Sequence, residues 1–228
     1  DIQYSLSGAN FKLVTAQGTF DVNSPLLGHF NVENIVASLI AAEQAGFALA
    51  DLIAVAPQLK GAPGRMQVIR DNERLFVVDY AHTPDALIQV LQTLKRHVSA
   101  QLWAVFGCGG DRDRGKRPLM TQAALDHADV ALITSDNPRT ENPEQIFADM
   151  KAGIQFDQHI VHEIHDRREA IKFAVKNAKD GDIVVIAGKG HENYQEIDGV
   201  RHWFDDVVEV QSAIDAQHHN SDSAYPAQ

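Results

Sequence analysis

Polar segments follow four apolar runs of the 228-residue sequence, and their residue types suit the binding of a charged small molecule. In one of them, Asp136-Asn137-Pro138-Arg139, a guanidinium, an amide and a carboxylate lie within a single turn. Arg139 could hold a carboxylate through two parallel hydrogen bonds while Asp136 accepts from an ammonium, so the pair would bind a zwitterion. The alternative is a cap for the helix that should begin near Pro143.

The glycine-rich segment from Gly107 to Arg114 comes close to two phosphate-binding motifs but completes neither. Arg112 stands where the dinucleotide fingerprint needs its third glycine, and Arg117 stands where a Walker A motif needs a magnesium-binding Ser or Thr. The segment instead indicates an anion-binding loop before a helix. The loop and the start of the following helix together contain four cations: Arg112, Arg114, Lys116 and Arg117. The alternative is a solvated turn whose charge is balanced by Asp111 and Asp113.

The other two polar segments are Asp79-Tyr80-Ala81-His82 and Gly188-Lys189-Gly190-His191-Glu192. Two glycines beside Lys189 would let the backbone approach a ligand closely, and Glu192 could accept from an amine. A flexible turn is the alternative. The segment His162-Glu163-Ile164-His165 lacks both the spacing of a helical zinc site and a third ligand, so we expect no metal site there.

Near-continuous apolar strands alternate with amphipathic helices after Gly61-Ala62-Pro63-Gly64, which predicts an α/β fold with a mostly parallel sheet covered on both faces. The expected strands are 75–78, 102–106, 130–134 and 183–187, and the expected helices are 84–97, 119–127, 143–153 and 167–178. Ligands bind beyond the carboxyl ends of parallel strands, so we expect the four polar segments to converge at one edge. Before the linker, a hairpin over 11–22 should precede helices over 31–45 and 50–59.

The composition is that of an ordinary globular protein, with 44% hydrophobic and 22% charged residues. Its 20 Lys and Arg against 31 Asp and Glu give a net charge of −11, which argues against binding to nucleic acid or to an anionic membrane. One cysteine, Cys108, favours a reducing compartment, and no membrane-spanning run or signal peptide is evident. We therefore expect a cytoplasmic protein. Because the chain begins with Asp1, we also expect a piece of a longer protein.

The order of the motifs resembles the Mur ligases, and the resemblance runs from about Gly8 to Ala213. The matching motifs are Gly28-x-Phe30-Asn31-Val32-x-Asn34, Gly64-Arg65-Met66, Asp79-Tyr80-Ala81-His82-x-Pro84-Asp85, Gly107-x-Gly109-Gly110-Asp111-Arg112-Asp113, Lys116-Arg117-Pro118, Asp136-Asn137-Pro138-Arg139 and Gly188-Lys189-Gly190-His191-Glu192. The resemblance implies that residues 1–62 are the C-terminal part of a central ATPase domain and that 63–216 form a Rossmann-like, amino-acid-binding domain. The polar residues 217–228 are expected to be a disordered tail.

The motifs narrow the resemblance to the branch of the family that adds meso-diaminopimelate to UDP-N-acetylmuramoyl-L-alanyl-D-glutamate. This step belongs to peptidoglycan synthesis, which cell shape and division require. Such ligases use ATP and Mg²⁺ to form an acyl phosphate, which the amine of diaminopimelate then attacks. The family's P-loop and carbamylated lysine do not occur in these 228 residues, so the resemblance implies a C-terminal fragment that is inactive alone. No catalytic residue is assigned, and a monomer with small-molecule substrates is expected.

The resemblance also implies two sets of binding residues. The diaminopimelate pocket would contain Arg112, Asp136, Asn137, Pro138, Arg139, Gly188 and Glu192. Residues near the nucleotide would be Asn31, Asn34, Arg65, Asp79, His82 and Lys116. Arg139 is expected to set specificity, because diaminopimelate carries one carboxylate more than lysine.

Two alternative functions remain open, and a third is disfavoured. A lysine-adding or folate-polyglutamating relative would use similar chemistry on another substrate. A catalytically silent module would bind an amino acid or a nucleotide without turnover. A dehydrogenase domain is disfavoured because Arg112 breaks the dinucleotide fingerprint.

Overall fold

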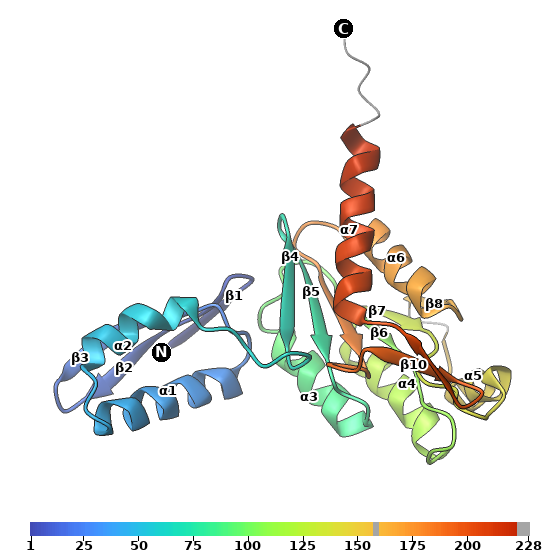
Figure 1. Ribbon diagram of the computed structural model, residues 1–228, viewed down its shortest axis with the longest axis horizontal. Coiled ribbons are helices and arrows are strands. Elements are labelled where there is room, and N and C mark those ends of the chain that lie inside the picture. The colour runs from blue at the N-terminus through green and yellow to red at the C-terminus, as the bar shows by residue number, and fades with distance from the viewer. Residues whose placement is uncertain (157–159, 223–228) are drawn as a thin grey trace, which may run out of the picture.

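The computed structural model describes residues 1–156 and 160–222, which form two units side by side (Figure 1). The N-terminal unit is a small sheet covered by helices, and the C-terminal unit is a larger sheet with helices on both faces (Figure 1). Residues 59–66 join them and contain neither helix nor strand. The predicted domain division at residue 62 lies inside this segment, and the division itself stays a prediction. None of the described helices is both long and apolar enough to cross a membrane.

The N-terminal unit is an antiparallel three-stranded sheet with one face packed on helices. Its elements are β1 (Ile2–Ser5), β2 (Gly8–Thr15), β3 (Gly18–Ser24), α1 (His29–Gln44), α2 (Leu49–Val55) and the 3₁₀ turn Ala56–Gln58. In β2, Phe11 and Leu13 are buried while Lys12 and Val14 are exposed, which is the alternation that a half-buried strand requires. The predicted hairpin and both predicted helices are confirmed, whereas β1 was not predicted.

The C-terminal unit contains a six-stranded sheet with the strand order β4-β5-β9-β6-β7-β8. The strands are β4 (Gln67–Asp71), β5 (Arg74–Asp79), β6 (Leu102–Phe106), β7 (Val130–Ile133), β8 (Ile160–Glu163) and β9 (Ile183–Ala187). All neighbours pair in parallel except β4, which is antiparallel to β5 and forms one edge. The predicted α/β class with a mostly parallel sheet is confirmed.

Helices cover both faces of this sheet, so its central strands are buried throughout. They are α3 (Pro84–Leu94), α4 (Lys116–His127), α5 (Pro143–Lys151), α6 (Arg167–Asn177) and α7 (Asp206–Asp222). Side chains of α3, α4 and α5 pack into one core with Val77, and those of α6 and α7 pack into another with Val78. Because side chains alternate along a strand, consecutive residues of β5 serve opposite cores. This burial explains why the central strands are nearly continuous apolar runs.

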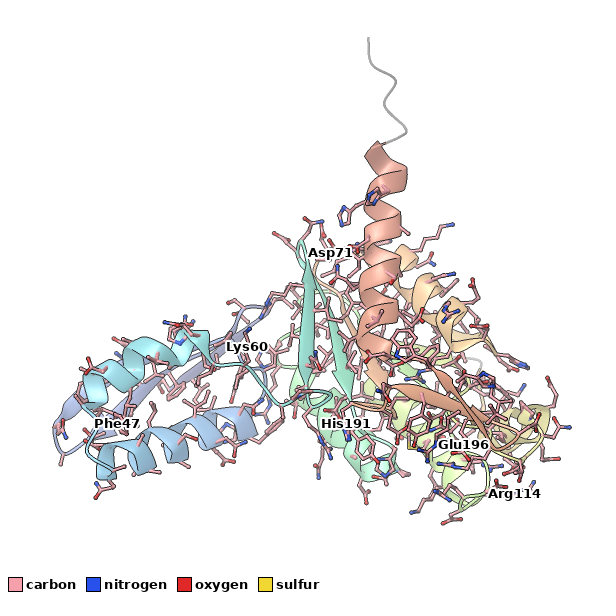
Figure 2. The ribbon with its side chains drawn as sticks, viewed as in Figure 1. Phe47, Lys60, Asp71, Arg114, His191 and Glu196 are labelled. Carbon is pink, nitrogen blue, oxygen red and sulfur yellow. The ribbon has the colours of Figure 1, made fainter. Side chains whose placement is uncertain are left out.

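The predicted disordered tail is wrong for its first six residues, because α7 continues to Asp222. Gln217 Oε1 accepts from Arg74 Nη2 at 3.2 Å, and a ring nitrogen of His218 lies 2.8 Å from Asp71 Oδ1. Asp71 stands at the end of β4 beside α7 (Figure 2). These contacts bind the helix to residues more than 140 positions earlier, which local polarity does not reveal. Residues 223–228 lie outside the described part of the chain.

His97, just after α3, joins the two units through both nitrogens of its ring. Its Nδ1 lies 2.7 Å from the Ser5 carbonyl oxygen, which can only accept, so Nδ1 carries the proton. Its Nε2 accepts from the Gly28 N–H at 3.1 Å. The rings of Tyr4 and His97 pack in a T-shaped arrangement, with their centroids 4.9 Å apart. The contact therefore requires a neutral imidazole, and burial lowers the pKa of His97.

We expect the junction to weaken in acid, because protonated His97 would turn an N–H toward the Gly28 N–H. The folded-state pKa of His97 lies below the value of about 6.5 for an unfolded chain, so this stability is present above pH 6.5 and is lost as the pH falls below it. Urea unfolding at pH 7.5 and 5.5 should show a larger loss for wild type than for His97→Gln, by up to about 1.4 kcal/mol, because pH 5.5 lies about one unit below the pKa of the unfolded chain. Equal losses in the two proteins would contradict this assignment.

Candidate functional site

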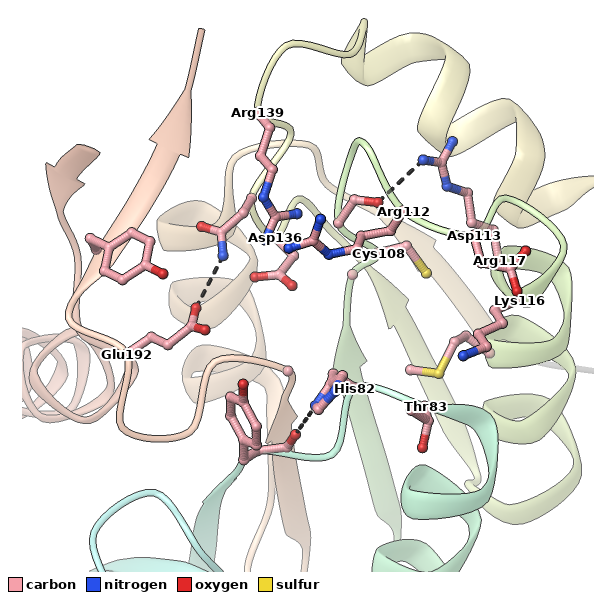
Figure 3. Close-up of a pocket in the computed structure, with 17 residues that line it drawn as sticks. His82, Thr83, Cys108, Arg112, Asp113, Lys116, Arg117, Asp136, Arg139 and Glu192 are labelled. Carbon is pink, nitrogen blue, oxygen red and sulfur yellow. Dashed lines mark hydrogen bonds between the residues drawn. The ribbon is translucent and has the colours of Figure 1, made fainter. Parts of the chain in front are cut away.

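The four polar segments meet around one cavity at the carboxyl ends of β5, β6, β7 and β9 (Figure 3). The cavity has a volume of about 480 Å³. The predicted convergence of these segments is therefore confirmed. Six of the seven residues expected in the diaminopimelate pocket line it: Arg112, Asp136, Asn137, Arg139, Gly188 and Glu192. The seventh, Pro138, is buried behind the loop, where it lines a small space together with Ile146 and Phe147 of α5.

Two carboxylates, those of Asp136 and Glu192, line the part of the cavity that we call its acidic end. Asn137 Nδ2 donates to Glu192 Oε2 at 3.0 Å, which fixes the carboxylate against the amide (Figure 3). Asp136 follows β7, and its own carbonyl oxygen accepts from Gln195 Nε2 at 2.7 Å. Beneath them Lys189 Nζ donates to Asn137 Oδ1 at 2.9 Å. The two carboxylates offer acceptors to an ammonium group that enters the cavity.

Two guanidinium groups also line the cavity. Arg112 and Arg139 both lie against Gly109, and a Cβ at that position would stand 2.8 Å from Arg139 Nη1. Arg139 Nη1 donates to the Gly110 carbonyl oxygen at 2.8 Å, and Arg112 Nη1 donates to the Asp111 carbonyl oxygen at 3.0 Å. Each arginine uses only part of its five-donor fork in this way. The remaining N–H groups can bind a carboxylate or a phosphate.

A short hairpin holds Arg139 in place. Its strands are β10 (Tyr194–Ile197) and β11 (Val200–Trp203). Arg139 has a left-handed backbone with φ of 52°, which is uncommon for a residue with a side chain. Its N–H donates to the Glu196 carbonyl oxygen at 2.9 Å, and its carbonyl oxygen accepts from the Asp198 N–H at 2.7 Å. The hairpin thus stabilises the conformation that turns the guanidinium into the cavity.

Two of the four cations predicted for an anion-binding loop serve another purpose. Arg117 is buried and pairs with Glu141 and Asp149, with shortest N–O distances of 2.6 and 2.8 Å. Arg114 Nε lies 2.7 Å from Asp149 Oδ2. Hydrogen bonds from Arg117 hold the pKa of Glu141 down at about 2, and those from Arg114 lower the pKa of Asp149. These arginines anchor the glycine loop to α5, so only Arg112 and Lys116 remain for an anion.

The cap of α5 and the thiol of Cys108 also have roles that their surroundings decide. Asn142 caps α5, because its side chain accepts from the Glu144 N–H at 3.0 Å, so Asp136 is free of that role.

Cys108 lines the cavity, but burial raises the pKa of its thiol to about 12, which keeps it protonated and unreactive.

The residues predicted to lie near a nucleotide are divided between two places. His82 and Lys116 line the main cavity. Arg65 and Asp79 line a second hollow of about 520 Å³, between α3 and the start of α1. Asn31 and Asn34 line neither: Asn31 Nδ2 donates to the Leu27 carbonyl oxygen at 2.7 Å, and Asn34 is exposed on α1. The structure therefore does not gather this set at one point.

Asp79 is held by the backbone. Its carboxylate accepts from the N–H groups of Met66 at 2.8 Å and Ala81 at 2.9 Å, and burial raises its pKa. It thereby fixes the end of the linker to the end of β5. Its neighbour Tyr80 contacts a residue of each hollow. The Arg65 guanidinium carbon lies 4.8 Å from the centroid of the Tyr80 ring. The His82 ring packs in a T-shaped arrangement with the Tyr80 ring, and their centroids are 4.6 Å apart.

The linker also crosses the Gly188–Glu192 loop at a pair of glycines. Gly190 has φ of 53°, and a Cβ there would lie 2.7 Å from both the Gly64 carbonyl oxygen and Tyr80 Cβ. A Cβ on Gly64 would lie 2.1 Å from the backbone nitrogen of His191. His191 is seen where the linker reaches the larger unit (Figure 2). Only two glycines permit so close a crossing.

Sequence reasoning assigned no role to two residues of the site. The flanking glycines draw attention to the backbone at Lys189 and not to its side chain. A lysine two residues after a buried strand is nevertheless a signal that its ammonium could lie in the site. Tyr194 lines the cavity, and its ring lies 4.3 Å from the Arg201 guanidinium. Nothing in the local sequence singles it out, because its position depends on the unpredicted hairpin.

Comparison with known proteins agrees with this geometry. Residues 64–190 match the family model described as "Mur ligase, glutamate ligase domain". The chain belongs to the Mur ligase family. The match covers the crossing glycines and the strands that end at the cavity, so the fold class and the family agree on the same residues.

Relatives named UDP-N-acetylmuramoyl-L-alanyl-D-glutamate–2,6-diaminopimelate ligase are similar over most of this chain. The one from Ectopseudomonas mendocina is 47% identical over 217 residues, which are 95% of this chain and 44% of that protein. The one from Geobacillus thermodenitrificans is 44% identical over 93% of this chain and 44% of that protein. The chain therefore spans less than half the length of these relatives.

Solved structures show the same likeness. A structure of a ligase with that name has 79% sequence identity and a TM-score of 0.84, over 96% of this chain and 45% of the other. The UDP-N-acetylmuramate-alanine ligase of Thermotoga maritima has 16% identity and a TM-score of 0.62, over 96% of this chain and 45% of the other. At that identity the second likeness concerns the fold alone.

We expect Gly190→Ala to lower the free energy of unfolding more than Gly199→Ala does. Both glycines have positive φ, at 53° and 74°, so both substitutions should cost about 1–2 kcal/mol of left-handed strain. At Gly199 a Cβ meets nothing within 4 Å, whereas at Gly190 it meets backbone of the linker. Urea denaturation of the two variants measures the difference. Equal losses of unfolding free energy in the two variants would show that the linker can move aside without an energetic cost.

Proposed function

We propose that this chain is the amino-acid-binding part of an ATP-dependent amide ligase that adds meso-diaminopimelate to UDP-N-acetylmuramoyl-L-alanyl-D-glutamate. One observation carries the proposal: a single cavity is lined both by the carboxylates of Asp136 and Glu192 and by the guanidinium groups of Arg112 and Arg139. The names of the relatives point to the same substrate pair.

The arrangement fits a carbon that bears both an ammonium and a carboxylate. The ammonium would lie between Asp136 and Glu192, and the carboxylate would receive N–H groups from Arg139. Diaminopimelate has such a carbon at each end, so one end can be held while the amine of the other attacks. Lysine has a carboxylate at one end only. A pocket that binds the far end through Arg139 therefore discriminates between the two.

The other reactants would approach from the second hollow. In the proposed reaction, ATP phosphorylates the glutamate carboxylate, and the free amine of diaminopimelate displaces phosphate from the acyl phosphate to form the amide. Lys116 and His82, which line the main cavity, would face this developing charge. Arg65, in the second hollow, would lie toward the nucleotide.

Mg²⁺ would offset the charge of the phosphoryl groups when it is bound. The described residues contain no group of three or more His, Cys, Asp or Glu side chains placed to hold a metal ion. No metal ligand of this chain is therefore proposed. The protein would act in the cytoplasm as a monomer, in the synthesis of peptidoglycan precursors.

Calorimetric titration with meso-diaminopimelate, with L-lysine as the matched ligand, tests the proposal. Binding of the first and not the second would support an amino-acid pocket that reads the extra carboxylate. Preference for lysine would favour a lysine-adding relative. Binding of nucleotide alone, with neither amino acid, would favour the silent binding module.

We expect Arg139→Ala to weaken binding of meso-diaminopimelate by roughly 10- to 200-fold, because a charge-assisted hydrogen bond contributes about 1.5–3 kcal/mol. The partly exposed side chain makes one hydrogen bond to backbone, so the free energy of unfolding should change little. Calorimetry measures the affinity, and urea denaturation measures the stability. Unchanged affinity would remove Arg139 from the pocket.

We also expect no ligation by the 228-residue chain alone. The family's P-loop is outside these residues, so the phosphates of ATP would lack their main binding loop. Incubation with ATP, Mg²⁺, diaminopimelate and the UDP-linked dipeptide, followed by mass spectrometry, should show no amide product. Detection of that product would refute the expectation.

A further inference from the structure

Lys189 places a buried ammonium directly beneath the acidic end of the cavity. Its side chain is 0% exposed. Its Nζ lies 2.9 Å from Asn137 Oδ1, 3.4 Å from Asp136 Oδ1 and 3.7 Å from Glu192 Oε2. A buried charge is costly unless it is paired and hydrogen-bonded, so these three partners account for its presence.

The ammonium sets the orientation of the Asn137 amide. Asn137 Oδ1 accepts from Lys189 Nζ and from the Glu196 N–H, the latter at 3.0 Å. Both of these groups can only donate, so the oxygen must face them and Nδ2 must face Glu192. A flipped amide would bring its NH₂ group against the ammonium. Lys189 therefore positions Asn137, and Asn137 positions the Glu192 carboxylate.

The ammonium also balances charge in the acidic end. The charged and titratable groups around Lys189 are Asp136, Glu192, Arg167, Asp206 and Tyr194. Arg167 Nε lies 2.8 Å from Asp206 Oδ1, so the charges of this pair cancel. Two carboxylates and one ammonium then leave a net charge of −1. Burial lowers the pKa of Lys189, and Asp136 and Glu192 oppose that effect.

We propose that Lys189 is the positioning residue of the amino-group subsite: it orients Asn137 and cancels one of the two carboxylate charges, so that the subsite binds one ammonium instead of a proton. The inference rests on the proposed function, in which this end of the cavity receives an amino group of the substrate. Lys189 is enclosed beneath the subsite, so it acts through its neighbours and not by contact with the ligand.

Two variants separate charge from hydrogen bonding. Lys189→Met keeps the length of the side chain and removes both, whereas Lys189→Gln removes the charge and can still donate to Asn137. Lys172→Met is the control, because its ammonium pairs with Glu169 on the exposed face of α6. Calorimetry with meso-diaminopimelate at pH 6 and pH 8, in two buffers of different ionisation enthalpy, reports both affinity and protons released.

At pH 6 we expect both Lys189 variants to bind meso-diaminopimelate at least about tenfold more weakly than wild type does, which corresponds to one pKa unit. Without the ammonium, the two carboxylates share a proton that the ligand must displace, so binding should release a proton. Part of the loss should recover at pH 8, where that proton has already left. The Lys172→Met control should match wild type.

A loss of affinity that is equal at both pH values, without proton release, would show that Lys189 only supports the fold and would overturn the proposal. Unchanged affinity would overturn it as well. A ligand-free measurement separates it from the proposed function. Carboxyl-carbon NMR signals of Asp136 and Glu192, followed against pH, should titrate at higher pH in the folded variants than in wild type. If wild type binds no diaminopimelate, the proposed function fails, and this titration alone decides whether Lys189 balances the charge.

Discussion

A buried ion pair beneath the cavity holds together the elements on which the site depends. Arg167 Nε and Nη2 each donate to the Asp206 carboxylate at 2.8 Å, and both side chains are 0% exposed. The same guanidinium donates to the carbonyl oxygens of Ala187 at 3.0 Å and Ser135 at 3.4 Å. Those carbonyls immediately precede Gly188 and Asp136. One cation thus ties α6 and α7 to the two loops of the acidic end, and removal of one partner from such a pair typically costs about 3–5 kcal/mol.

The site brings many charged side chains together. Almost every one of these side chains is paired with a group from another part of the fold. Arg117 and Arg114 both pair with Asp149 on α5, Lys189 donates to the oxygens of Asp136 and Asn137, and Arg139 is turned inward by the β10–β11 hairpin. The groups that remain available are therefore few and fixed in direction. A rigid, partly neutralised cavity of this kind selects a ligand by where its charges lie, which suits a zwitterion better than a simple anion or cation.

The junction between the two units lies beside both hollows, because Arg65 and Asp79 line one of them and Tyr80 lines the other. Asp79 fastens the linker to β5, Tyr80 carries Arg65 on one side and His82 on the other, and Gly64 crosses Gly190 at contact distance. A shift of the linker would move the Gly188–Glu192 loop with it, because the crossing leaves no space between the backbones. The junction is thus built from backbone packing and not from a flexible surface loop.

The sequence by itself determined the α/β class, most helices and central strands, and the edge of the sheet where the chemistry lies, because apolar periodicity and the rule for parallel strands are local signals. It also identified six of the seven residues expected in the diaminopimelate pocket as ones that line the cavity. Only the tertiary structure decided which charges face that cavity: it turned Arg114 and Arg117 to α5, buried Lys189, left Asn31 and Asn34 on α1 away from both hollows, and continued α7 past residue 217. The outcomes for Arg114, Arg117, Lys189 and α7 are pairings between residues far apart in the chain, and local pattern contains no information about which distant partner a polar or charged side chain will find.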